Sequence, residues 1–302
     1  MVSVIIPNYN HARFLDERIQ SILNQTYQDF EIMILDDSST DNSMEVISRY
    51  KDHPKVTKIV VNEHNSGSPF KQWQKGISMA NGEVIWIAES DDNCEPTFLE
   101  TLMKKYDEEK AVLAFCKSVI IDQNGEKHSN YFQDELTDSF VMEGEAFIRQ
   151  YLAFKPYVQN ISSAIFCKAV AQRVADQFTS YRVAGDWLFS IEIAKEGKVV
   201  FQQQALNMFR IHNANTTFSE MKNGNVARET KQIYDYLLAV GHISDKDYRW
   251  HRKDRMRQIH FSGFSEPTRN ELLNMWGASK KDRLWLRMLS VYNRLLLIKK
   301  RL

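Results

Sequence analysis

Short apolar runs alternate with longer amphipathic segments through the first hundred residues. The runs have the length of β-strands and cover residues 2–6, 31–35, 56–61 and 84–88. Between them, apolar residues recur at helical spacing, as Leu15, Ile19 and Ile22 do. Strands that alternate with helices in this way are typical of βα units around a parallel sheet. The sequence therefore predicts an α/β fold.

After residue 111 the pattern is less regular. A strand is expected over residues 112–121, and Asn124-Gly125 favours a hairpin turn directly after it. Further strands are predicted at residues 160–166, 199–201 and 206–211, with a helix over residues 185–194. The chain is predominantly helical after about residue 225, so we expect two parts, residues 1–225 and 226–302.

Polar residues follow each of the first four predicted strands directly. They are Pro7-Asn8-Tyr9-Asn10, residues 36–41, residues 62–67, and Glu89-Ser90-Asp91-Asp92. The carboxyl ends of parallel strands meet at one edge of a sheet, and ligands of α/β proteins bind there. Carboxylates gathered at such an edge repel one another unless a cation or hydrogen-bond donors offset their charge. We therefore expect a ligand site there, with Mn²⁺ or Mg²⁺ among its ligands.

A divalent cation held by these carboxylates could neutralise a diphosphate, so a nucleotide is the ligand that the clusters favour. The sequence has no glycine-rich dinucleotide fingerprint after its first strand and no P-loop pattern anywhere. Phosphate binding is therefore expected to depend on the metal and on isolated basic side chains.

Four stretches resemble the nucleotide-binding half of family 2 glycosyltransferases. In chain order they read V-S-V-I-I-P-N-Y-N, I-L-D-D-S-S-T-D-N-S, N-S-G-S-P-F-K-Q-W-Q-K-G-I and I-A-E-S-D-D. The resemblance covers about residues 1–215. It implies the GT-A fold, a Rossmann-like mixed sheet flanked by helices, with a helical C-terminal extension. It further implies a nucleotide-binding half over residues 1–110, an acceptor half over 111–225, and inverting, metal-dependent transfer of a sugar from a nucleotide diphosphate to a hydroxyl.

The resemblance also implies site residues. Those expected to bind the nucleotide are Pro7, Tyr9, Asn10, Asp36, Asp37, Asn65, Lys71 and Asp91. Asp37 is expected to accept a hydrogen bond from the base, which suits uracil, thymine or guanine alike. Asp91 and Asp92 match the family's D-x-D element, with Asp91 toward the ribose and Asp92 on the metal. Glu89 stands where the family usually has aspartate.

Each of these acidic clusters has a structural alternative. Residues 36–41 could form an Asx turn and a helix cap, since Asp and Ser favour both. Asp91 and Asp92 could cap the helix that begins near Pro96. Lys71 could be a solvated surface lysine.

The catalytic base is expected in Gly185-Asp186-Trp187, which resembles the family's acidic motif at a helix start. An aspartate with an ordinary pKa of about 3.9 is already ionised at neutral pH, so the position of Asp186 matters more than tuning. Trp187 is expected to form an apolar wall for a sugar ring. The alternative is that Asp186 caps the helix and Trp187 belongs to the core.

His212 follows the last predicted strand and resembles the family's late histidine element. A neutral imidazole is a suitable ligand for Mn²⁺, so His212 is expected on the metal, with Arg210 on the phosphate. A purely structural histidine is the alternative.

The C-terminal segment changes the meaning of the net charge. The chain has 39 basic and 39 acidic residues, but 14 of the basic and 4 of the acidic residues lie from Arg249 onward. Leu284, Met288 and Val291 share one face of a predicted helix, with basic residues beside it. This pattern fits an interfacial helix on an anionic membrane, so residues 279–302 are expected to bind one. Packing on the catalytic domain or on a second subunit, which would make a homo-oligomer, is the alternative, and nucleic acid is not an expected partner.

Taken together, the sequence predicts an enzyme that uses a nucleotide-diphosphate sugar, expected to be a UDP-sugar, and a glycan or lipid-linked acceptor in surface-polysaccharide synthesis. The absence of a signal segment and of a long apolar run, with three scattered cysteines, favours a peripheral protein on the cytoplasmic face of the cell membrane. A sugar-phosphate nucleotidyltransferase and a non-catalytic nucleotide-sugar-binding module are the alternatives.

Overall fold

The computed structural model describes residues 1–131, 135–212 and 220–299. The chain forms two compact units, Met1–Asn215 and Thr216–Leu302. The division therefore falls slightly before the boundary that the sequence suggests after residue 225.

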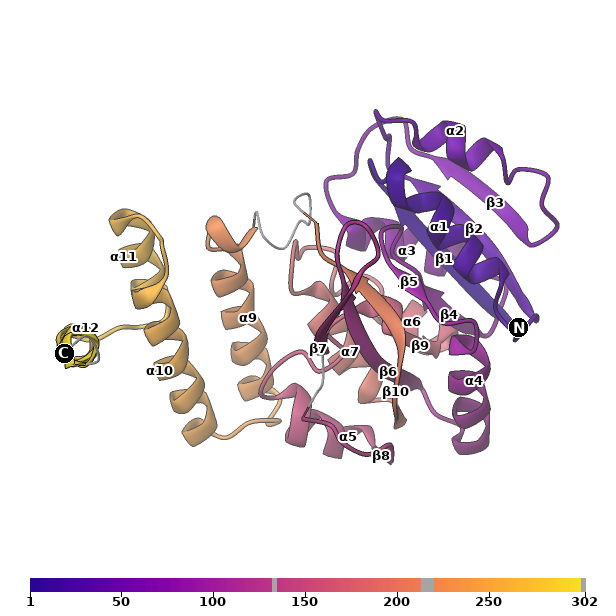
Figure 1. The fold of residues 1–302 in the computed structure, drawn as a ribbon. Coiled ribbons are helices and arrows are strands. Elements are labelled where there is room, and N and C mark those ends of the chain that lie inside the picture. Colours follow the sequence, from indigo (N-terminus) through magenta and orange to yellow (C-terminus); the bar gives the residue numbers. More distant parts are fainter. Residues whose placement is uncertain (132–134, 213–219, 300–302) are drawn as a thin grey trace. The chain divides into compact units, whose positions relative to one another are not determined.

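The first half of unit 1 is a run of βα units (Figure 1). Its strands are β1 (Val2–Asn8), β2 (Phe30–Asp36), β3 (Val56–Val61) and β4 (Val84–Ile87), and its helices are α1 (Ala12–Leu23), α2 (Ser43–Ser48), α3 (Pro69–Met79) and α4 (Phe98–Glu109). These four strands pair in parallel in the order β3-β2-β1-β4. The predicted parallel arrangement of this half is confirmed.

The second half of unit 1 makes the sheet mixed, as the GT-A resemblance implies. Its strands are β5 (Asn93–Cys94), β6 (Leu113–Ile121), β7 (Lys127–Tyr131), β8 (Phe140–Glu143), β9 (Ala164–Cys167) and β10 (Lys198–Arg210). Its helical segments are α5 (Gly144–Phe147), η1 (Ile148–Leu152), η2 (Ile161–Ser163), α6 (Lys168–Val174) and α7 (Gly185–Ala194). The main order continues as β4-β9-β6-β10-β5, with β7 on β6 and β8 on β10.

Strand β10 is one strand where the sequence suggests two. The glutamine run that begins at Gln202 reads as a break, but the chain absorbs it in two register shifts against β6 and stays paired as far as Arg210. Because β9 is antiparallel to both β4 and β6, β6 and β10 run in the same direction as β1 and β4. The end of β10 therefore lies on the same edge of the sheet as the ends of β1 and β4.

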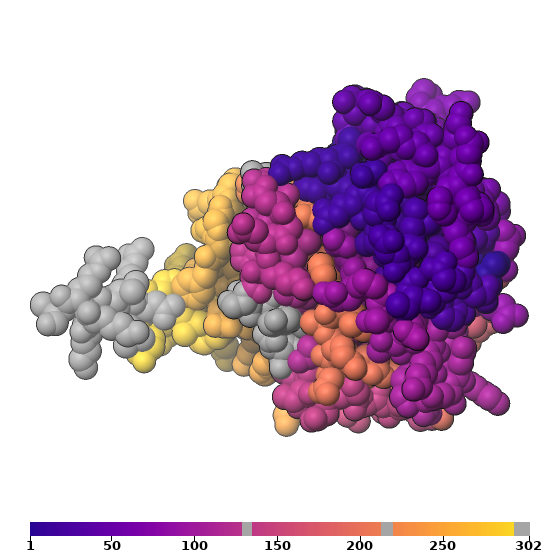
Figure 2. All heavy atoms as spheres, turned by 45° about the vertical axis from the view of Figure 1, so that its right-hand side comes forward, coloured from indigo at the N-terminus to yellow at the C-terminus, as the bar shows by residue number. Residues whose placement is uncertain are grey.

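Helices cover both faces of the sheet. Val4 and Ile6 of β1 pack with Leu15 of α1 and Leu99 of α4 in one buried cluster. Ile5 points the other way, against Gly76 of α3, where an added Cβ would lie 2.5 Å from the Ile5 side chain. Strands buried on both faces read as continuous apolar runs, and each buried aliphatic side chain contributes about 1.5–3 kcal/mol. In Figure 2, orange residues from the end of this unit lie against magenta and purple residues from earlier in the chain.

Unit 2 is helical. It consists of α9 (Asn225–Ala239), α10 (Asp245–Phe261), α11 (Glu266–Met275) and α12 (Lys280–Lys299). A reciprocal capping box between Ser244 and Asp247 starts α10. Tyr234, Met256 and Trp276 form part of its buried core. Within the described residues, none of the helices combines the length and apolar character needed to cross a bilayer.

Candidate active site

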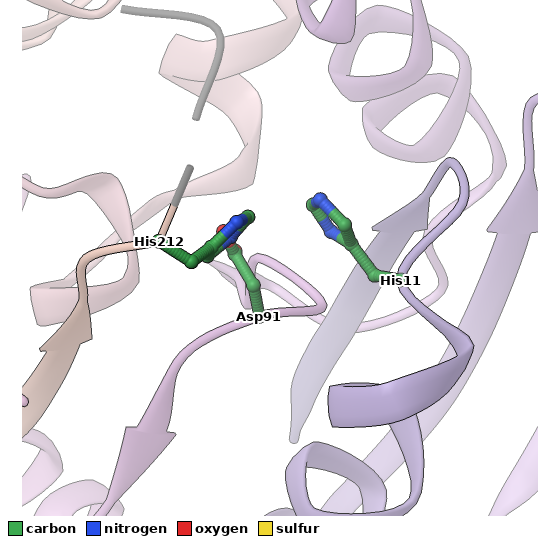
Figure 3. A group of neighbouring side chains, drawn as sticks. All are labelled: His11, Asp91 and His212. Carbon is green, nitrogen blue, oxygen red and sulfur yellow. The ribbon is translucent and has the colours of Figure 1, made fainter. Parts of the chain in front are cut away.

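Three side chains from distant segments converge at the carboxyl edge of the sheet. His11 lies between β1 and α1, Asp91 follows β4, and His212 follows β10. Their ligand atoms all lie within 4.8 Å of one another, and the three side chains point toward a common space (Figure 3).

Hydrogen bonds and ring contacts hold this group in place. His212 Nε2 lies 2.9 Å from Asp91 Oδ2, and His11 Nδ1 lies 2.8 Å from Ser90 Oγ. The two imidazole rings meet edge to face at 5.4 Å, and Phe14 packs on His212 at 4.9 Å. Burial disfavours the charged form of Asp91, but the hydrogen bond from His212 and the charges of both histidines outweigh it and hold the pKa of Asp91 below its usual value. Asp91 is therefore an anion at neutral pH.

These residues fit a divalent transition metal. One carboxylate oxygen and two imidazole nitrogens suit Mn²⁺, whereas Mg²⁺ prefers oxygen ligands alone. A site with three protein ligands also leaves positions for diphosphate oxygens.

Asp92 differs from Asp91 in its surroundings. It is 1% exposed, and its Oδ2 accepts hydrogen bonds from Asn160 Nδ2 at 2.9 Å and from Ser162 Oγ at 2.6 Å. Its Oδ1 accepts from the backbone N–H of Arg210 at 3.0 Å. Burial and the charge of Asp91 raise the pKa of Asp92 to about 6. The sequence suggests Asp92 for the metal, but the structure brings Asp91, not Asp92, into the group with the histidines.

Glu89, which stands where the family usually has aspartate, is fixed by hydrogen bonds of both its side chain and its backbone. Its carboxylate accepts from Trp73 Nε1 at 2.8 Å, and its backbone N–H donates to Ser162 Oγ at 3.0 Å. Burial, followed by repulsion from Asp91, raises its pKa to about 8.

The two aspartates after β2 are buried within the chain's own hydrogen bonds. Asp36 accepts from Asn8 Nδ2 at 2.7 Å and from the backbone N–H of Ser39 at 2.8 Å. The predicted Asx turn is formed by Asp41, whose Oδ1 accepts from the backbone N–H of Ser43 at 3.0 Å. Asp37 is 4% exposed and accepts from Asn62, Ser66 and Gln72. Its Oδ2 takes one of these bonds, leaving capacity for a further donor such as a base N–H.

The remaining expected nucleotide ligands differ in exposure. Tyr9 and Asn10 are exposed, and Asn10 adopts a left-handed backbone (φ 57°) in which its Oδ1 accepts from the backbone N–H of Thr40 at 2.7 Å. Pro7, by contrast, is buried within β1, so its side chain does not face a ligand. Asn65 and Lys71 are exposed, and Lys71 donates to the backbone oxygen of Ser66 at 3.1 Å.

Asp186 lies at the start of α7, next to α3. A Cβ on Gly185 would lie 2.8 Å from the Phe70 ring, so this turn packs directly on α3. Asp186 is half-buried, and its Oδ1 accepts from the backbone N–H of Trp187 at 2.8 Å. Trp187 is 2% exposed and donates its indole N–H to the Leu152 carbonyl at 2.8 Å. The expectation that Trp187 walls a sugar ring is therefore corrected: its ring belongs to the core.

The expectation that Arg210 binds a phosphate is also corrected. Arg210 is 1% exposed, and all three of its guanidinium nitrogens donate to the protein, so it offers no free face to a phosphate. Its ring contact is with Phe14, at 4.9 Å.

The site predicted from the sequence does not include His11, Asn160 or Ser162. His11 directly follows the polar cluster after the first strand, and that position was the available signal. Asn160 and Ser162 come from the irregular approach to β9, and nothing local marks them as partners of Asp92.

The chain is similar in sequence to known proteins. A family model described as Glycosyl transferase family 2 matches residues 3–177. An uncharacterized glycosyltransferase of Nostoc is 28% identical over 297 residues, which cover 92% of this chain and 87% of the relative. Glycosyltransferase GlyG of Streptococcus pneumoniae is 31% identical over 190 residues, which cover 63% of this chain and 52% of that protein.

Two solved structures share the fold. The first 349 residues of Staphylococcus aureus TarS, in complex with UDP-GlcNAc, match with a TM-score of 0.59 at 18% identity, over 91% of this chain and 71% of that one. Mannosyltransferase PcManGT of Pyrobaculum calidifontis, in complex with GDP-Man and Mn²⁺, matches with a TM-score of 0.58 at 16% identity, over 96% and 84%.

Proposed function

The chain belongs to glycosyl transferase family 2, and on this premise we propose that it transfers a sugar from a UDP-sugar to a hydroxyl group of a glycan or lipid-linked acceptor, with inversion and with Mn²⁺ bound. Membership makes it a nucleotide-sugar-dependent glycosyltransferase, and so neither a nucleotidyltransferase nor a binding module. The observation that carries the proposal is the convergence of His11, Asp91 and His212 at the edge of the sheet where nucleotides bind.

The donor would lie across this edge. Tyr9, Asn10 and Asp37 would contact the nucleoside, and Lys71 is exposed in the first turn of α3, where it could meet phosphate. His11, Asp91 and His212 would hold the divalent cation, which when bound offsets the negative charge of the diphosphate leaving group. The choice of uridine is supported by the UDP complex of TarS, a structural neighbour, whereas the other neighbour carries GDP-Man.

Asp186 is proposed as the general base. Its carboxylate would accept the proton of the acceptor hydroxyl as that oxygen bonds to the anomeric carbon, while the bond from this carbon to the diphosphate breaks. Support comes from its position at the start of α7, packed beside α3, the helix that carries Lys71.

Turnover of nucleotide sugars tests this proposal. We expect release of a nucleoside diphosphate from one of a panel of nucleotide sugars with Mn²⁺, and a strong loss in Asp91→Asn and in Asp186→Asn. Asp52→Asn, which changes an exposed aspartate outside the site, is the matched control. Wild-type rates in both site variants would contradict the assignment.

We also propose that α12 binds an anionic membrane, at the cytoplasmic face where a lipid-linked acceptor would be presented. Leu284, Met288, Val291 and Tyr292 are 58–63% exposed on one side of the helix, while Leu286 on the opposite side is buried. Basic residues flank the exposed face, and each can contribute about 1 kcal/mol near an anionic surface. The side chains beyond Tyr292, including Arg294 and Leu295, and residues 300–302 lie outside the part of the chain that the structure describes.

Vesicle binding tests this second proposal. The full chain should sediment with phosphatidylglycerol vesicles and much less with phosphatidylcholine, and Met288→Glu should weaken that binding about tenfold or more. Lys222→Gln, at an exposed position elsewhere in unit 2, changes the net charge by the same one unit and is the control. Equal sedimentation of Met288→Glu and wild type would reject the membrane role, and a concentration-dependent dimer lost in Met288→Glu would assign the face to a second copy instead.

A further inference from the structure

Arg210 is a buried cation at the end of β10, two residues before His212. Its side chain is 1% exposed, which is uncommon for an arginine and is tolerated only when the charge is paired and hydrogen-bonded. Its partners therefore indicate what it does.

Arg210 forms hydrogen bonds to three other segments of unit 1. Its backbone N–H donates to Asp92 Oδ1 at 3.0 Å, and its Nε donates to the backbone oxygen of Asp91 at 2.7 Å. Its Nη1 donates to the backbone oxygen of Asp122 at 3.1 Å, at the end of β6, and its Nη2 meets Glu17 Oε2 of α1 at 2.7 Å. One residue thus joins α1, the Glu89–Asp92 loop, the β6–β7 turn and β10.

Arg210 is connected to both residues of the contact between Asp91 and His212. The guanidinium fixes the backbone of Asp91 directly, and its own backbone leads to His212 within two residues. It also lies over the Phe14 ring at 4.9 Å, and the same ring packs on His212 at 4.9 Å. The position of Arg210 therefore sets the positions of both partners of the 2.9 Å contact.

We infer that Arg210 is a positioning residue that holds Asp91 and His212 in register with each other, with Glu17 as its counter-ion. It acts through the backbone and through Phe14 and contacts neither donor nor acceptor. Its value for catalysis rests on the proposed function, but the positioning itself is a property of the protein alone.

The geometry requires an arginine. Three guanidinium nitrogens serve three partners in fixed directions, whereas the single ammonium of lysine cannot reach all of them. Arg210→Lys should therefore keep the positive charge but lose the set of three side-chain hydrogen bonds. Glu17→Gln should leave the guanidinium buried with its main anionic partner neutralised, and should have a smaller effect in the same direction.

Two measurements on purified full-length protein test the inference. The first is long-range ¹H–¹⁵N NMR of the histidine rings without metal, with the His212 signals assigned from His212→Gln. We expect Arg210→Lys to shift or broaden the His212 signals and to leave those of His260 in unit 2 unchanged. The second is calorimetric titration with Mn²⁺ alone, where Arg210→Lys should weaken binding about 10- to 100-fold.

Arg173→Lys is the matched control, because Arg173 pairs with Glu196 at 2.6 Å on the surface. A folded Arg210→Lys protein with wild-type His212 signals and wild-type Mn²⁺ affinity would overturn the inference, even if its thermal stability fell. If Arg210→Lys changes the His212 signals while Asp91→Asn still turns over nucleotide sugar, the positioning role is supported and the proposed metal site is contradicted. Failure of this inference is therefore distinguishable from failure of the proposed function.

Discussion

His212 Nε2 lies 2.9 Å from Asp91 Oδ2, although 121 positions separate the two residues in the chain. The contact exists because β10 runs in the same direction as β4 and ends at the same edge of the sheet. It joins the two halves of unit 1 at the point where the nucleotide is proposed to bind.

Asp91 and Asp92 should respond differently to amide substitution. Asp91→Asn should weaken Mn²⁺ binding by at least about 100-fold and should change the unfolding temperature little. Loss of a residue that only hydrogen-bonds to a metal ligand already lowers metal affinity about 10- to 100-fold, and loss of the ligand itself should lower it more. Asp92→Asn should lower the free energy of unfolding by about 1–3 kcal/mol, because Asp92 accepts three internal hydrogen bonds. Titration calorimetry measures the Mn²⁺ affinity, and thermal unfolding measures the stability. Loss of Mn²⁺ affinity in Asp92→Asn, with Asp91→Asn affecting only stability, would identify Asp92 as the metal ligand.

Asp186→Asn should lower kcat about 10²- to 10⁴-fold, the usual value of a general base. Donor binding should be unchanged, because Asp186 is assigned to the acceptor and not to the nucleotide. Steady-state kinetics with a calorimetric Kd for the donor separates these quantities. A large rise in donor Kd with kcat preserved would remove the base assignment.

Trp187→Phe should act on stability alone. The change removes the indole N–H that donates to Leu152 and leaves a small gap, so the free energy of unfolding should fall by about 1–3 kcal/mol. Urea unfolding checks the loss, and acceptor KM should stay within about twofold of wild type. A large increase in acceptor KM without loss of stability would restore the predicted sugar-binding role.

His251 in α10 should make the stability of unit 2 depend on pH. Burial, assisted by the charge of Arg255, lowers its pKa from 6.5 to about 4. Between these values the unfolded chain binds the proton and the folded chain does not, so stability falls as the pH drops from 7 toward 4, by on the order of 2 kcal/mol at pH 5. Urea unfolding of the wild type at pH 7 and pH 5 measures this.

His251→Gln should flatten that pH dependence, because glutamine does not titrate in this range. His128→Gln, at an exposed position in unit 1, should leave it unchanged. An equal loss of stability at low pH in wild type and His251→Gln would assign the effect to other groups.

Much of unit 1 was predictable because its local signals agree. The first four strands are largely apolar runs that each end in a polar cluster, so β1 to β4 lie within a residue or two of their predicted bounds. The hairpin at Gly125 was predictable for the same reason, since Asn-Gly favours that turn whatever surrounds it. The interruption at Gln202 was misread, because the pairing with β6 that carries the strand past it is a long-range interaction.

The candidate site was predictable in its location and less so in its roles. Asp91 was selected for the ribose and His212 for the metal because each follows a predicted strand and matches a motif of the family. His11 also follows a strand at this edge but was not selected. Arg210 and Trp187 carry side chains that commonly bind phosphate and sugar, yet both are buried. Burial depends on the neighbours that β10 and α7 acquire in the folded chain, which the residues themselves do not encode locally.

The amino-acid sequence by itself determined the α/β class, the family resemblance and the edge at which the ligand should bind, because strand periodicity and strand-end polarity are local properties. Only the tertiary structure decided which of two adjacent carboxylates meets the histidines. Asp91 and Asp92 are chemically the same, and the choice between them comes from what each one faces: the imidazole of His212 on one side, and the N–H groups of Arg210, Asn160 and the hydroxyl of Ser162 on the other.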